Sequence, residues 1–127
     1  LRCSMAHVLL IGLGGGLGAV ARHAIDQVTI TQLGSSLLGT FIANMSGTFL
    51  LGLLVGLLST HGTWPEEIRI FVAVGFLASY TTFSTLSVAT IELVDKGDLY
   101  GAALNLGMSI FLGLICATVG IVLGKAI

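Results

Sequence analysis

The sequence predicts an all-α integral membrane protein with four transmembrane helices. Of its 127 residues, 55% are hydrophobic and only 9% are charged, whereas a soluble domain usually carries about 25% charged residues. The formal net charge is −1, so the chain offers no basic surface to a nucleic acid. Because one span needs roughly 20 apolar residues, this length corresponds to a single four-helix transmembrane domain covering residues 1–127.

The apolar segments place the four spans at about 5–25, 35–60, 68–94 and 99–125. The first is interpreted as a retained span, because hydrophobic segments continue through the rest of the chain. Before the third span, Thr63 and Glu66 have the spacing of a capping box, and Pro65 is expected in the first helical turn. Asp98 is the expected N-cap of the fourth span. With four spans, both termini lie on the same side of the membrane.

Glycines recur four residues apart, as Gly12/Gly16, Gly14/Gly18, Gly52/Gly56 and Gly120/Gly124. Pairs of small residues at this spacing let transmembrane helices approach closely. The first glycine run also fits a dinucleotide-binding motif, but that motif requires a preceding strand in a soluble βαβ unit. The glycines therefore predict a tight helical bundle with a narrow pore or none.

The positively charged residues are divided almost equally between the two sides of the membrane. Arg2, Arg69 and Lys125 lie on the side of the termini, whereas Arg22 and Lys96 lie on the other. Because Lys/Arg asymmetry sets orientation, a near-tie suggests insertion in both directions, and hence an antiparallel dual-topology dimer. On this count alone, a fixed orientation remains an equal alternative.

Groups suited to catalysis are scarce. The carboxylates, Asp26 among them, are expected in turns or at helix ends, with Glu92 near the end of the third span. The three histidines also lie at span ends, and no His/Ser/Asp or His/Cys set shares a location. The two cysteines lie far apart, which argues against a metal site or a disulfide. The sequence therefore does not predict an enzyme.

Neutral hydrogen-bonding side chains follow helical spacing inside the spans. Thr40, Asn44 and Thr48 share one face of the second span, and Asn105 and Ser109 share a face of the fourth. For a single serine or threonine, the simplest interpretation is that its hydroxyl makes a hydrogen bond between helices. For the two asparagines, whose amides are harder to satisfy in lipid, a packing role and a functional role both remain open.

Five hydroxyl side chains fall within residues 81–87, near the centre of the third span. Hydroxyls compete with the backbone ladder, so this segment predicts a broken helix. Broken helices at membrane depth line cavities or bind ions. Free carbonyls would suit a cation, while hydroxyl donors and helix N-termini would suit an anion. Without a carboxylate at this depth, the residues favour a passive anion pathway.

Three segments resemble motifs of the Fluc (CrcB-type) fluoride channels. Gly75–Ser87 (GFLASYTTFSTLS) is similar to the family's third-helix signature, GFxGGxTTFSTFS. Gly39–Asn44 (GTFIAN) is similar to its second-helix G-T-x-x-x-N, and Gly14–Arg22 (GGGLGAVAR) to its GGxxGAxxR. The resemblance extends over essentially the whole chain.

This resemblance implies an antiparallel dual-topology homodimer in a bacterial or archaeal plasma (inner) membrane. Its two pores would conduct fluoride passively out of the cell and so relieve fluoride toxicity. The implied pore residues are Asn44, Phe83, Leu86, Thr40, Thr82, Ser84, Thr85, Asn105 and Ser109. Arg22 would lie near a vestibule, and backbone carbonyls of Ala78 and Thr81 would hold a structural sodium ion at the dimer centre.

Some positions depart from the family pattern. Leu86 occupies the place of a second phenylalanine, and Ala78 and Ser79 occupy that of a glycine pair. Leucine has no positive ring edge for an anion, which puts one ion contact per pore in question, although Asn105 could supply a replacement donor. Leu86 also raises the alternative that the chain forms one half of a heterodimeric fluoride channel.

Two other readings compete. A small multidrug resistance exporter has a similar size and topology, but it uses a membrane-embedded glutamate in its first helix. Here the ionisable residues expected in that helix are His7, Arg22 and His23. A purely structural helical bundle would explain the small residues but not the TTFST string together with Asn44.

Overall fold

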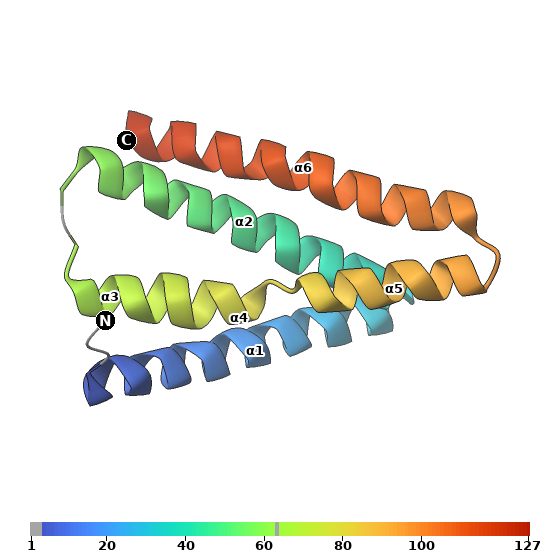
Figure 1. The fold of residues 1–127 in the computed structure, drawn as a ribbon, viewed down its shortest axis with the longest axis horizontal. Coiled ribbons are helices and arrows are strands. Elements are labelled where there is room, and N and C mark those ends of the chain that lie inside the picture. Colours follow the sequence, from blue (N-terminus) through green and yellow to red (C-terminus); the bar gives the residue numbers. More distant parts are fainter. Residues whose placement is uncertain (1–3, 63) are drawn as a thin grey trace.

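The computed structural model describes residues 4–62 and 64–127, and all regular structure in this part of the chain is helical (Figure 1). Four stretches are long and apolar enough to cross a membrane: Met5–Leu33, Ser36–Thr60, Glu66–Asp95 and Leu99–Ala126. The start of α1 and the end of α6 lie at the same end of the bundle (Figure 1). The predicted all-α fold with four spans is confirmed.

The first helix is longer than predicted. Helix α1 (Met5–Leu33) continues past residue 25 and ends only at Gly34, whose φ of 67° is left-handed. Residues 26–33 include no glycine or proline. The hydroxyls of Thr29 and Thr31 donate hydrogen bonds to backbone carbonyls one turn earlier in the same helix. These polar residues therefore do not interrupt the helix. As a consequence Asp26, expected in a turn or at a helix end, lies well inside α1.

Helices α2 (Ser36–Thr60) and α6 (Leu99–Ala126) form the most extensive helix pair. A Cβ atom at Gly52 would lie 2.5 Å from the Ala117 carbonyl oxygen, and one at Gly120 would lie 2.8 Å from the Leu53 amide nitrogen. The two backbones therefore touch where the glycines face each other. This confirms the close packing predicted for these small residues.

The third stretch contains four consecutive elements. Helix α3 (Glu66–Arg69) continues into a π-helix, η1 (Ile70–Leu77), and then into α4 (Ala78–Tyr80) and α5 (Phe83–Asp95). The chain leaves helical geometry between α4 and α5, although the axis bends only slightly there (Figure 1). The predicted break near the centre of the third helix is confirmed, whereas the π-helix before it was not predicted.

The helix starts agree with the sequence in part. Asp98 caps α6, since its Oδ1 accepts from the Gly101 N–H at 2.8 Å, as predicted. Helix α3 begins at Glu66, so Pro65 is the N-cap residue and does not belong to the first turn. Thr63, the other member of the predicted capping box, lies outside the described residues.

Candidate functional site

The break in the third helix consists of two extended residues. Thr81 has φ −84° and ψ 154°, and Thr82 has φ −150° and ψ 119°. β-branched side chains favour extended backbone, and the Thr82 hydroxyl caps α5 by accepting from the Thr85 N–H at 3.3 Å. The threonines themselves thus favour the break. It lies at the N-terminal end of the hydroxyl-rich segment 81–87 that predicted it, and Ala78–Tyr80 remain helical.

The four carbonyls of residues 78–81 lose their helical donors at this break, and those of Ala78 and Thr81 are among them. In a continuous helix the Thr82 N–H would donate to the Ala78 carbonyl, and the Thr85 N–H to the Thr81 carbonyl. Here the Thr82 N–H donates to Asn44 Oδ1, and the Thr85 N–H donates to Thr82 Oγ1. The carbonyl oxygens of Ala78 and Thr81 are therefore available for another partner.

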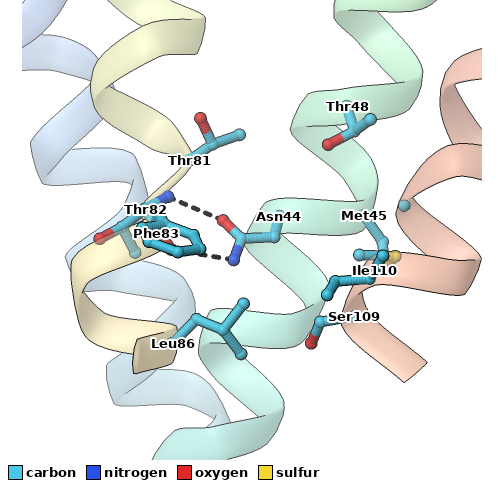
Figure 2. Close-up of a pocket in the computed structure, with 10 residues that line it drawn as sticks. Asn44, Met45, Thr48, Thr81, Thr82, Phe83, Leu86, Ser109 and Ile110 are labelled. Atoms are coloured by element: carbon cyan, nitrogen blue, oxygen red, sulfur yellow. Dashed lines mark hydrogen bonds between the residues drawn. The ribbon is translucent and has the colours of Figure 1, made fainter. Parts of the chain in front are cut away.

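Asn44 reaches the break from the middle of α2. Its Oδ1 accepts from the Thr82 N–H at 2.7 Å, and its Nδ2 donates to the Thr82 carbonyl at 3.1 Å (Figure 2). One side chain thus replaces two backbone partners, as a neighbouring strand would. The second hydrogen of the Asn44 amide takes no part in either bond.

A pocket of about 270 Å³ lies between α2, the break and α6 (Figure 2). Its lining residues are Asn44, Met45, Thr48, Thr81, Thr82, Phe83, Leu86, Ser109, Ile110 and Gly113. Ser109 is only 7% exposed, and its Oγ is buried without a hydrogen-bond partner among the described residues. None of the lining residues carries a formal charge. The pocket therefore offers neutral donors surrounded by apolar groups.

Phe83 and Leu86 lie at the pocket in different surroundings. Phe83 leaves 75% of its surface exposed, while Leu86 is only 7% exposed. Both follow the break within the first turn of α5. An exposed aromatic ring beside uncharged donors can turn its positive edge toward an anion. In the single chain, most of the surface of the Phe83 ring contacts no other residue.

The pocket gathers five of the nine predicted pore residues: Asn44, Thr82, Phe83, Leu86 and Ser109. Ser84 and Thr85 line a separate groove, together with Glu92. Their hydroxyls nevertheless lie 3.2 Å from Thr82 Oγ1, so hydrogen bonds join residues of the two hollows.

The other predicted residues lie elsewhere. Asn105 Nδ2 donates to Thr90 Oγ1 at 3.0 Å and links α6 to α5. Thr40 is buried at 5% exposure and lines neither hollow. Arg22 lies on α1, where its Nε is buried and has no hydrogen-bond partner within the described residues.

Some features of the site were not predicted. Ser46 Oγ and Tyr80 Oη lie within hydrogen-bond distance, at 2.9 Å, which ties α2 to α4. A Cβ at Gly47 would press on the Tyr80 ring and the Thr81 methyl group. The i, i+4 spacing of polar residues on α2 predicted a functional face with Asn44 and Thr48, but Ser46 and Gly47 lie outside that face. Only the three-dimensional packing reveals them.

Residues 9–121 match the family model described as CrcB-like protein, Camphor Resistance (CrcB). This match covers most of the chain and includes all three motif segments. The chain belongs to the CrcB family. Together with its four apolar helices, this membership identifies a multi-pass protein of the plasma membrane.

Curated CrcB relatives are similar over nearly their whole length. "Fluoride-specific ion channel FluC 2" of Nitrobacter hamburgensis is 39% identical over 120 residues, covering 94% of each chain. "Fluoride-specific ion channel FluC" of Coxiella burnetii is 36% identical over 121 residues, covering 94% of this chain and 98% of the relative. The protein of the same name from Dehalococcoides mccartyi is 34% identical over 122 residues, with 95% and 94% covered.

CrcB membership decides against the small multidrug resistance exporter. One premise of that comparison was also wrong, because α1 does contain an acidic residue, Asp26. Its Oδ1 is buried without a partner among the described residues. A Cβ at Gly39 would meet this carboxylate, so α1 and α2 cross closely at Asp26.

Proposed function

We propose that this protein is a fluoride-selective channel that lets fluoride leave the cell passively and so relieves fluoride toxicity. The observation that carries the proposal is the uncharged donor pocket at the helix break, in a chain whose relatives are named fluoride-specific ion channels. The activity is transport down a gradient and involves no enzymatic step.

The chemistry of the pocket suits a small anion. The Ser109 hydroxyl and the second hydrogen of the Asn44 amide replace part of the hydration shell that fluoride gives up. Helix α5 begins at the break, and its N-terminus adds positive partial charge. A lysine or arginine here would hold the ion too tightly for release. Neutral donors permit binding that is weak enough for conduction.

The conducting unit is proposed to be an antiparallel dimer of two copies. Phe83 is 75% exposed at the edge of the pocket, which suits a ring that a second copy covers. The nearly equal division of Lys and Arg allows both orientations to insert. A two-fold symmetric dimer then contains two equivalent pores, with Ser84, Thr85, Thr40 and Asn105 extending the polar path and Arg22 near its entrance.

A structural sodium ion is proposed at the dimer centre. The Ala78 and Thr81 carbonyls have lost their helical donors, and the unwound carbonyls of broken membrane helices are typical sodium ligands. The donor set therefore fits the ion. Two oxygens from each chain would share it, so that sodium would join the two breaks.

The test is anion efflux from liposomes that contain only this chain. Fluoride efflux well above chloride efflux is the expected result. Chloride efflux at a similar rate would refute fluoride selectivity. No efflux of either ion from a correctly folded protein would refute the homodimer and favour the heterodimeric alternative, which co-reconstitution with a second family member would then test.

A further inference from the structure

We propose that Asn44 is a positioning residue that keeps the third helix broken at Thr82, and that it does so whether or not an ion is present. This inference rests on the proposed function, because it assigns the residue that maintains the geometry of that site. It differs from the role of a simple anion donor, in which Asn44 would matter only when an ion is bound.

The hydrogen bonds of Asn44 are reciprocal and both go to one backbone unit. Oδ1 accepts from the Thr82 N–H at 2.7 Å and Nδ2 donates to the Thr82 carbonyl at 3.1 Å. This pairing fixes the orientation of the amide, since the opposite orientation would set donor against donor and acceptor against acceptor. The Asn44 side chain is therefore already engaged within the chain itself.

The Thr82 N–H has one obvious alternative partner, the Ala78 carbonyl. That bond would extend α4 through the break and restore a continuous helix. In an apolar surrounding an unpaired backbone N–H is costly, so losing the Asn44 acceptor would favour this closure. Asn44 Oδ1 and the Ala78 carbonyl thus compete for the Thr82 N–H. The Ala78 carbonyl stays available only while this N–H is bound to Asn44.

The packing of α2 holds Asn44 within reach. One turn of α2 contacts the break region at two points. Ser46 lies 2.9 Å from the Tyr80 hydroxyl, and Gly47 lets the Tyr80 ring and the Thr81 methyl group approach the backbone of α2. Because these contacts fix the distance between α2 and the break, the Asn44 amide meets Thr82 without moving the helix.

The two hydrogens of the Asn44 amide also have different roles. One hydrogen of Nδ2 is bound to the Thr82 carbonyl, and the other remains for the pocket that Asn44 lines. A single side chain thus maintains the break and presents one oriented N–H to the ion path. Asn44 would not need to release Thr82 when an ion arrives.

The experiment compares Asn44→Ala with Thr48→Ala in membranes without fluoride. Thr48 lies one turn away on α2 and lines the same pocket, but does not contact Thr82 in the bonds described. Solid-state NMR of the Thr82 ¹³Cα and ¹³Cβ shifts reports backbone conformation. We expect extended-backbone shifts for Thr82 in the wild type and in Thr48→Ala, and shifts closer to helical values in Asn44→Ala. In Asn44→Ala we also expect fluoride efflux to fall at least about tenfold, roughly the value of one hydrogen bond.

Unchanged Thr82 shifts in Asn44→Ala, with efflux lost, would overturn the inference and leave Asn44 as an ion donor alone. A measurement on the wild type covers the case in which Asn44→Ala does not fold. Adding fluoride is expected to shift only one of the two Asn44 amide protons, whereas shifts of both would overturn the proposal. If the proposed function is wrong, wild-type efflux fails, but the fluoride-free Thr82 shifts still decide the role of Asn44.

Discussion

Replacing Gly14 with alanine tests whether α1 contacts η1 through backbone alone. A Cβ at Gly14 would lie 2.5 Å from the Phe71 carbonyl oxygen, so the helices must separate by about 0.5 Å to restore the shortest normal contact of 3.0 Å. Overpacking of this kind costs about 1–3 kcal/mol, and the better helix propensity of alanine returns about 1 kcal/mol. The expected net loss is about 1 kcal/mol of the free energy of unfolding.

Gly18→Ala, one turn later, would overlap the Phe76 carbonyl oxygen in the same way. We expect the double variant to lose about 2 kcal/mol. The matched control is Gly16→Ala on the same helix, where a Cβ would meet nothing within 4 Å. This control should equal or exceed the wild type in stability.

The assay is denaturant unfolding of the detergent-solubilised protein, followed by circular dichroism at one fixed protein concentration, because dimerisation makes stability concentration-dependent. The reasoning would be refuted if the Gly14/Gly18 double variant unfolded at the same denaturant concentration as Gly16→Ala. A larger loss in Gly16→Ala than in Gly14→Ala would refute the assignment of the packed glycine face.

Two further predictions concern transport and one concerns membrane topology. Phe83→Ile should cut fluoride efflux at least about tenfold, or roughly 1.4 kcal/mol on the barrier, because it removes the ring edge while keeping an apolar side chain; normal efflux with an intact dimer would contradict the role of this ring. Efflux should require sodium, with little rescue by larger alkali ions, and unchanged efflux after complete sodium removal and exchange would exclude the central cation. Tags on the C-terminus should be accessible from both sides of intact cells, whereas access from the cytoplasm alone would rule out dual topology.

The fold was predictable because its determinants are local. Four apolar stretches of spanning length and a cluster of threonines give the spans and the break directly. The end of α1 was not predictable in the same way, because Asp26, Thr29 and Thr31 have the composition of a turn. Thr29 and Thr31 satisfy their hydroxyls within the helix, and the chain turns only at Gly34.

The site could be predicted only in part, because sequence spacing identifies a helix face but not its neighbour. Gly12/Gly16 and Gly14/Gly18 are equivalent as patterns, yet only the second pair packs against η1. Asn44 was correctly selected as unusual, but its partner is the backbone of a residue 38 positions away. No side-chain pattern encodes that contact.

The length of α1 has a consequence for the surrounding bilayer. Its 29 residues, at about 1.5 Å each, give a rod of about 43 Å, whereas a hydrocarbon core is only about 30 Å thick. Only the apolar part of α1, about residues 5–25, has the length of the hydrocarbon core, so the polar end at residues 26–33 stands in the headgroup layer. In an antiparallel pair each leaflet would receive one such end. The displacement of headgroups would then be equal on the two sides, and the dimer would have no intrinsic preference for a curved membrane.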